Sequence, residues 1–310
     1  MIHGLITSII TPLLDNRELD TESLGKLLST VTEQSSALLL NSIYPGEGTF
    51  LPAETKNALI RETMEITSGR RALLIPITGN TTAETLNNVK RIEYLKDELD
   101  YKGEIVLFDC PLWYHSNRKL PAHYEKLAGL SSFPLILSNN PALISTLKTP
   151  LKRYNIRTAI LKSVLENDRI VGLEHSGNMH RFLNYMKAAR YRKDFLFYDG
   201  NELNFLNNPG TGGVISMGAN IVPKYWKEVV DSSLYPDDSQ NEDHGSRKHL
   251  WQIRQKVGEL HACYIKNPEV LLKTALRYRR IIDSDACCDT REATEEEKKK
   301  ICGVLDSMNF

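Results

Sequence analysis

Eight short apolar runs, separated by stretches with helical periodicity, constrain the fold of this chain more than any other feature. The runs are Leu5–Ile10, Ala37–Asn41, Ala72–Ile77, Glu104–Asp109, Pro134–Ser138, Ile170–Leu173, Phe195–Tyr198 and Gly213–Met217. Most are rich in branched aliphatic residues and bounded by turn residues, which is typical of strands buried on both faces of a parallel sheet. The intervening amphipathic stretches predict helices and include Thr21–Glu33, Ala53–Thr67 and Thr82–Leu99. Asp20, Pro52 and Thr81 are suited to the starts of these helices.

Eight strands that each precede a helical stretch predict a (β/α)₈ TIM barrel, a fold of the α/β class. A doubly wound open sheet shows the same alternation, because periodicity alone does not reveal closure. The count of eight, and the absence of a G-x-G-x-x-G motif after the first strand, favour the barrel. The pattern changes near residue 230, so we predict a barrel over residues 1–230 and a C-terminal helical extension, packed on the barrel, over residues 231–310. In the extension, Tyr235–Lys248 predicts an exposed loop, and Lys248–Ile282 and Thr294–Met308 predict helices.

The charge balance bears on possible partners. Lys and Arg total 39, and Asp and Glu also total 39. Nucleic acids and anionic membranes both need a basic surface, so neither is expected as the main partner. No run approaches about 18 uninterrupted apolar residues, and Met1–Pro12 lacks the features of a signal peptide. The five cysteines form no C-x-x-C pair, which favours reduced thiols and a cytoplasmic protein.

Turn motifs follow the predicted strands in a fixed order, and this order carries a resemblance. The motifs are Thr11-Pro12, IYPGE at 43–47, TGNTT at 78–82, PLW at 111–113, SNNP at 138–141, IVGLEHSGN at 170–178 and GTGGVIS at 210–216. Together they resemble the dihydrodipicolinate synthase and N-acetylneuraminate lyase family of pyruvate-dependent aldolases. The resemblance covers about the first 225 residues, and the remainder more loosely. It implies a homo-dimer or homo-tetramer, a small-molecule ligand at the barrel mouth, and a subunit contact at Trp113 and Tyr114.

The departures from the family pattern fall where the family's chemistry is expected. The resemblance implies a lysine that forms a Schiff base with pyruvate, and this chain has Glu174 at that position. An amine condenses with a ketone, whereas a carboxylate cannot. The implied proton-relay groups are two tyrosines and a threonine, and the corresponding residues here are Ser138, Trp113 and Tyr44. The arginine that contacts a substrate carboxylate in the synthases aligns with Leu143.

No other lysine is expected to replace the missing amine. The interiors of the predicted strands contain no lysine. Lys102 precedes the fourth strand at the opposite end of the barrel, and Lys162 lies in a helix-like stretch. Lys119, in the loop after the fourth strand, could reach inward, but we expect all three at the surface. Arg118 stays protonated and cannot serve as the amine.

The residues at the strand ends also bear on metal and thiol chemistry. The strand ends bring together Asp109, Cys110, Glu174, His175 and Asp199, and a carboxylate–histidine cluster there could bind a divalent metal. No two of these residues have metal-ligand spacing, and His175 should point away from Glu174 because strand side chains alternate. We therefore predict no metal and no cofactor. Cys110 is expected to be inert packing.

Two functional hypotheses remain open. In the first, the chain has lost class I aldolase activity and is a ligand-binding or regulatory homologue, whose ligand is 2-oxo acid-like or of another kind. In the second, it is a lyase or aldolase that acts on a 2-oxo acid through Glu174 or a metal. Whether the chain is an enzyme stays open. In both cases the expected ligand-binding residues are Tyr44, Glu47, Asp109, Ser138, Asn139, Leu143, Glu174, Asp199 and Ser216.

Overall fold

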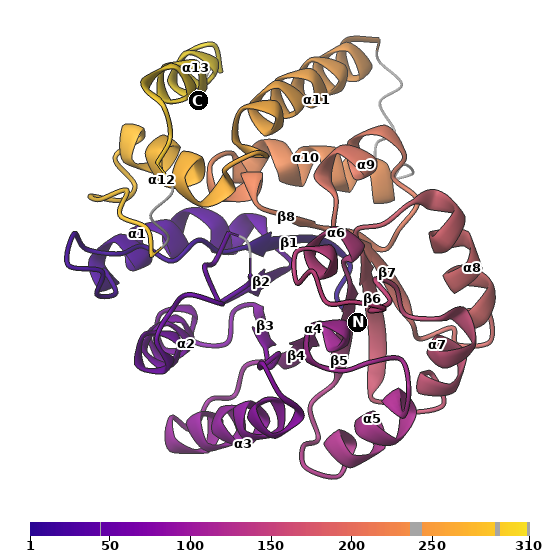
Figure 1. Cartoon of the computed structure of the whole chain (residues 1–310). Helices are drawn as coiled ribbons and strands as arrows, with labels where there is room; N and C mark the ends of the chain where they lie inside the picture. Colours follow the sequence, from indigo (N-terminus) through magenta and orange to yellow (C-terminus); the bar gives the residue numbers. More distant parts are fainter. Residues whose placement is uncertain (44, 236–243, 289–291, 309–310) are drawn as a thin grey trace.

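Eight parallel strands close into a barrel in the computed structural model, which describes residues 1–43, 45–235, 244–288 and 292–308. The strands are β1 (Gly4–Ser8), β2 (Ala37–Leu39), β3 (Ala72–Pro76), β4 (Ile105–Asp109), β5 (Leu135–Asn139), β6 (Ile170–His175), β7 (Leu196–Asp199) and β8 (Gly213–Ser216). They pair in sequence order, and β8 returns to pair with β1 (Figure 1). All eight predicted strands are therefore confirmed, and the fold is the closed (β/α)₈ barrel rather than the open sheet.

Helices surround the barrel on the outside (Figure 1). The longer ones are α1 (Thr21–Val31), α2 (Ala53–Thr67), α3 (Thr82–Glu98), α5 (Leu120–Ala128), α7 (Thr158–Val164), α8 (Met179–Ala189) and α10 (Pro223–Leu234). Short helices follow three strands: α4 (Pro111–Tyr114), α6 (Pro141–Ser145) and α9 (Glu202–Asn207). The predicted helix starts are confirmed, because Asp20 caps α1 by accepting from the Ser23 amide at 2.9 Å, and Thr81 caps α3. Pro52 stands at the N-cap of α2.

Alternation along the strands separates two apolar cores. The smaller cluster fills the barrel and includes Ile6, Leu39, Ile136, Tyr198 and Ile215. The larger cluster lies between the strands and the surrounding helices. Neighbouring residues of a strand face opposite sides of the sheet. The position of each residue in this alternation, the strand phase, decides whether a strand-end residue points into the barrel mouth.

In the part that the structure describes, the C-terminal region consists of helices joined by loops, without strands. These helices are α11 (His244–Tyr264), α12 (Pro268–Tyr278) and α13 (Glu295–Asp306), and α11 packs against α10 (Figure 1). Two predictions need correction. Pro268 begins a new helix, so Lys248–Ile282 holds two helices. Lys248 already belongs to α11 and not to a loop, while residues 236–243 lie outside the described residues. The domain boundary near residue 230 stays a prediction. None of the described helices is long and apolar enough to cross a membrane.

A buried ion pair joins this C-terminal region to the loop after β2. The side chains of Glu47 and Lys273 have no solvent exposure, and the Lys273 ammonium donates to the Glu47 carboxylate. Glu47 also accepts from the backbone amide of Cys288 at 2.5 Å, and Lys273 donates to the carbonyl of Ala286 at 2.6 Å. Glu47 was predicted to bind the ligand. That role stays a prediction, and in the structure the Glu47 carboxylate pairs with Lys273 of α12.

Candidate functional site

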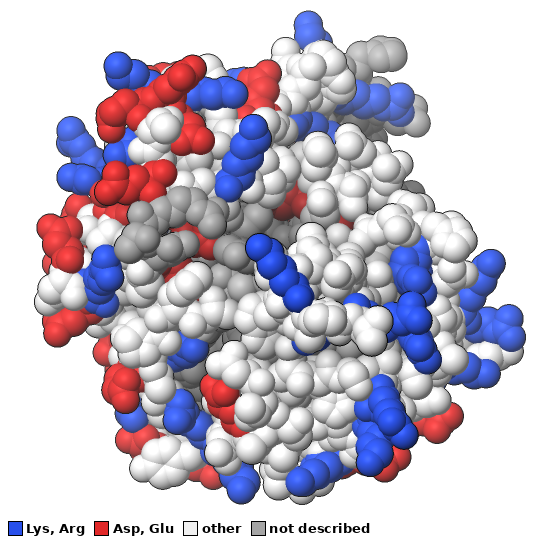
Figure 2. Space-filling view, viewed as in Figure 1, with Lys and Arg blue, Asp and Glu red and all other residues white. Residues whose placement is uncertain are grey.

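A cavity of about 450 Å³ opens at the carboxyl ends of the barrel strands. Its walls come from the ends of β1 to β8 and from residues 265–268, which connect α11 to α12. In the space-filling view, most Lys, Arg, Asp and Glu side chains lie over the surrounding helices, and a hollow lies over the barrel (Figure 2). In barrels of this architecture, the loops at this end carry the functional residues.

Glu174 lies in this cavity as a buried carboxyl group. It stands on β6 in register with Ser138 of β5, and its side chain is only 4% exposed. The hydroxyl groups of Ser138 and Ser176 each donate to one of its carboxylate oxygens. Burial raises the pKa of the Glu174 carboxyl, and the two hydroxyl donors lower it in part. Gly200 makes room for this group, since a Cβ atom there would lie 1.6 Å from Oε1.

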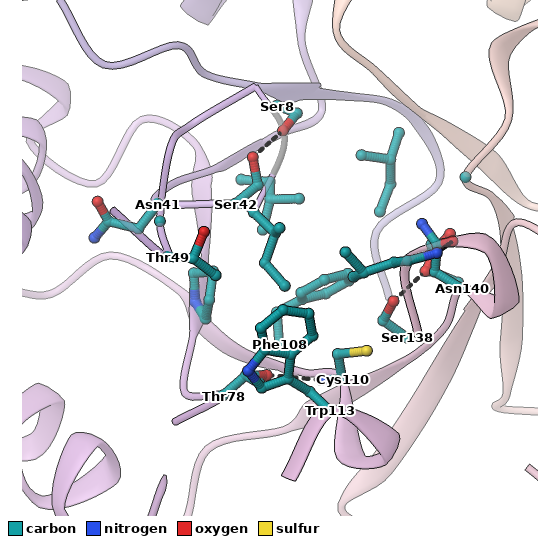
Figure 3. A pocket seen from close by; sticks show the side chains of 18 of the residues that line it. Ser8, Asn41, Ser42, Thr49, Thr78, Phe108, Cys110, Trp113, Ser138 and Asn140 are labelled. Atoms are coloured by element: carbon teal, nitrogen blue, oxygen red, sulfur yellow. Dashed lines mark hydrogen bonds between the residues drawn. The ribbon is translucent and has the colours of Figure 1, made fainter. Parts of the chain in front are cut away.

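The remaining cavity walls are mostly hydroxyl, amide and apolar groups (Figure 3). Ser8 and Ser42 are joined by a hydrogen bond of 2.8 Å on one side of the cavity, and Ser138 lies across from them. The Trp113 indole lines the cavity and donates to Asn80 Oδ1 at 3.3 Å. Such walls offer both donors and acceptors to a polar ligand, beside apolar surface for its carbon skeleton.

The structure brings only some of the predicted site residues into the cavity. Among the described residues, Ser138, Leu143, Glu174 and Trp113 line it. Tyr44 lies outside the described residues. Five others are not among the residues that line the cavity, and their role in ligand binding stays a prediction: Glu47, Asp109, Asn139, Asp199 and Ser216. For the last four the reason is strand phase, because the cavity is lined from alternate positions by Phe108, Ser138, Glu174 and Ile215.

Asp109 is held behind the cavity wall by three hydroxyl donors. The side chain has no solvent exposure and accepts hydrogen bonds of 2.8 Å from Thr78, Tyr114 and Tyr124. Burial raises the pKa of Asp109, and these hydroxyl groups oppose the rise. The arrangement fixes β4 against α5. Thr78 lines the cavity and therefore links Asp109 to the cavity wall.

Asn139 and Ser216 likewise serve the packing behind the strands. Asn139 Oδ1 accepts from the Ile156 amide at 2.8 Å, and Ser216 donates to Glu202 Oε1 at 2.5 Å. Asp199 is half-buried and accepts from the Asn201 amide at 2.9 Å. Burial, with a contribution from the charge of Glu174, raises the pKa of Asp199 to about 7.

His175 points away from the cavity, as predicted. Its ring packs on Phe182 and Tyr185 of α8 and is within 3.2 Å of the Asn139 amide. Cys110 lines the cavity, but burial raises the pKa of its thiol and disfavours the thiolate. Within the described parts of the chain, no three His, Cys, Asp or Glu residues gather as a metal site.

Three lysines that no sequence motif marks lie near the cavity. Lys56 and Lys266 line the cavity, and Lys152 donates to the carbonyl of Trp113 at 2.8 Å. Burial lowers the pKa of Lys56. The sequence signal that could have identified Lys56 is its place in the first turn of the helix after the IYPGE loop. The lysines that were considered, at positions 102, 119 and 162, are all exposed, as expected.

These features define a (β/α)₈ barrel protein with a polar cavity at the carboxyl ends of its strands. Residues 1–306 match the Dihydrodipicolinate synthetase family, and the chain belongs to that family. It is 30% identical over 248 residues to the 4-hydroxy-tetrahydrodipicolinate synthase of Shewanella frigidimarina, covering 76% of each protein. It is 25% identical over 315 residues to the same-named protein of Rickettsia akari, covering 100% of this chain and 98% of the relative.

Solved structures agree on the fold. The dihydrodipicolinate synthase of Bacteroides thetaiotaomicron superposes with a TM-score of 0.80 at 22% identity, covering 99% of both chains. The 4-hydroxy-tetrahydrodipicolinate synthase of Methylacidiphilum fumariolicum gives a TM-score of 0.79 at 23% identity, covering 99% of this chain and 95% of the other. These similarities establish the same barrel over almost the whole chain.

Proposed function

We propose that this member of the family binds a small polar molecule at the barrel mouth and lacks Schiff-base aldolase chemistry. The observation that carries the proposal is Glu174, a buried carboxyl group in the cavity at the position that resembles the family's lysine. A carboxyl group cannot form the iminium that makes class I aldolase chemistry possible. We further propose that Ser138, Leu143 and Glu174 contact the ligand, since all three line the cavity.

The lysines that line the cavity are the groups that could replace the missing Schiff-base amine. Lys56 is the more suitable replacement amine, because burial lowers its pKa and so favours the neutral, nucleophilic form. Lys56 belongs to the outer helix α2, however, and not to a barrel strand. The nearby carboxylate of Glu84 also opposes the lowering of its pKa. We propose that neither Lys56 nor Lys266 forms an imine, because Ser138 and Leu143 also replace the relay and anion contacts that the resemblance implies.

Restoring the amine alone should not restore activity. We expect Glu174→Lys to show no synthase turnover, because the proton relay is absent as well as the amine. Turnover is measured beside the Shewanella frigidimarina relative, assayed under the same conditions. The matched control is Glu174→Gln, which removes the charge without adding an amine. Clear turnover by Glu174→Lys, and none by Glu174→Gln, would contradict the expected result.

A lyase or aldolase acting on a 2-oxo acid through Glu174 is the second candidate function. Its supporting observation is the raised pKa of the buried carboxyl, which suits a general base. An activity on 2-oxo acids that disappears in Glu174→Gln, or that requires added metal, would favour this second function.

We also propose that the protein forms a homo-dimer or homo-tetramer. The outer face of α8 carries Met179, Leu183 and Met186, all between 42% and 51% exposed and spaced along one side of the helix. Apolar side chains grouped in this way are typical of association surfaces. We expect the double change Leu183→Lys with Met186→Lys to lower the mass measured by light scattering. Lysines introduced at two exposed polar positions of α3, Asn87→Lys with Asp97→Lys, should leave it unchanged.

We propose a cytoplasmic location for the protein. All five cysteines are free in the structure. Free thiols in this number are typical of a reducing compartment.

A further inference from the structure

The buried carboxyl group of Glu174 has no ion-pair partner among the described residues of the cavity. The groups that contact the Glu174 carboxyl are the neutral hydroxyls of Ser138 and Ser176. In the part of the chain that the structure describes, no Lys, Arg or His nitrogen forms an ion pair with Glu174. A buried carboxylate without a cationic partner costs free energy, and a cation supplied from outside would recover part of it.

A second carboxyl group lies beside Glu174 and is itself mostly protonated below about pH 7. Asp199, on the neighbouring strand β7, lies close enough for the charge of Glu174 to raise its pKa. The Glu174 charge also raises the pKa of Cys110, which lines the same cavity. An anionic ligand group placed against Glu174 would be repelled, whereas a cationic group would be attracted.

The other residues that line the cavity indicate what chemical groups the rest of the ligand carries. They include the hydroxyl groups of Ser8, Ser42 and Thr49 and the amide of Asn140 (Figure 3). Hydroxyl and amide side chains both donate and accept, so they suit a ligand that carries several hydroxyl groups. Phe108 and Trp113 give the cavity apolar surface for a carbon skeleton.

We infer that the cavity takes a small hydroxylated molecule with a protonated amine, and that the amine is seated against Glu174. This inference rests on the proposed function, because a Schiff-base lysine elsewhere in the cavity would place a different demand on the ligand. The ligand group at Glu174 is thus a cation, whereas a 2-oxo acid would bring an anionic carboxylate to this place. The ammonium group would complete the hydrogen bonds of the carboxylate and balance its charge.

Three six-carbon probes that differ only at one end test the inference. Glucamine ends in an ammonium group, sorbitol in a hydroxyl group and gluconate in a carboxylate. Binding of each to the full chain is measured by ligand-observed NMR titration. We expect glucamine to bind at least tenfold more tightly than sorbitol, and gluconate to bind least. Glucamine binding no tighter than sorbitol, or no glucamine binding at all, would overturn the inference.

Two variants locate the amine. Glu174→Gln should weaken glucamine binding about tenfold or more and leave sorbitol binding unchanged. Glu84→Gln, at a second acidic residue among the described residues that line the cavity, should change neither. A glucamine preference that survives in Glu174→Gln would also overturn the inference. Failure of the proposed function would instead appear as a covalent pyruvate adduct, which none of these titrations measures.

Discussion

Replacing Lys273 by Met should lower the free energy of unfolding by about 3–5 kcal/mol, because it leaves the Glu47 carboxylate buried without its cation. Glu47 would keep the Cys288 amide as a donor, but one neutral donor does not balance a charge taken out of water. The change also removes a tie between α12 and the loop after β2, part of which lines the cavity. Urea denaturation followed by circular dichroism measures the effect.

Two further variants separate the buried charge from general damage. The double variant Glu47→Gln with Lys273→Met should recover a large part of the lost stability, because it removes both charges. Lys26→Met, at an exposed lysine of α1 that pairs with Glu22 and Asp283, should leave the denaturation midpoint nearly unchanged. A Lys273→Met protein as stable as the parent would show that the ion pair has no such role.

The second large effect is a fall in stability between about pH 4 and pH 7 that depends on Asp199. The folded-state pKa of this carboxyl is raised to about 7, well above its ordinary value. In this pH window the unfolded chain has released the proton while folded Asp199 retains it. Stability therefore falls as the pH rises through the window. Above the window this group causes no further change, and the stability stays at the lower level. Asp199→Asn removes the titration and keeps an acceptor for the Asn201 amide.

The comparison of the two proteins across pH gives the measurement. We expect the parent to lose roughly 1–3 kcal/mol relative to Asp199→Asn between pH 4 and pH 7.5. Asp194→Asn provides the opposite case, because the Arg192 guanidinium lowers the pKa of Asp194. A carboxyl of that kind contributes stability that is lost only as the pH falls, so the parent should show no such decline relative to Asp194→Asn as the pH rises. Parallel pH profiles for the parent and Asp199→Asn would contradict the assignment.

The strands could be predicted because each one leaves a complete local signal. Buried parallel strands are short, apolar and bounded by turns, so runs such as Ala72–Ile77 stand out without any knowledge of their neighbours. The boundaries between helices were predicted less accurately, because a break between two helices leaves a weaker local signal. Lys248–Ile282 has a continuous helical composition, and only Pro268 marks where α12 begins anew.

The candidate site was predicted in part, and strand phase explains most of the difference. Ser138 and Glu174 were placed by their motifs, and they lie together in the cavity. Asp109 and Asp199 were included because they end strands, but the sequence does not show which side of the sheet a strand-end residue faces. The pairing of Glu47 with Lys273 spans more than two hundred residues and depends on tertiary packing that no local pattern encodes. Lys56 was missed because it belongs to a helix, although its first turn borders the cavity.

The most direct test of the central claim is borohydride trapping with pyruvate, read by intact mass and by peptide mapping. The synthase of Shewanella frigidimarina, treated in parallel, serves as the positive control. The absence of a Schiff-base amine predicts no adduct on this chain beside a clean adduct on the control. A stable adduct on one lysine, with Lys56 the first peptide to examine, would contradict the claim and show that a relocated amine performs the family's chemistry.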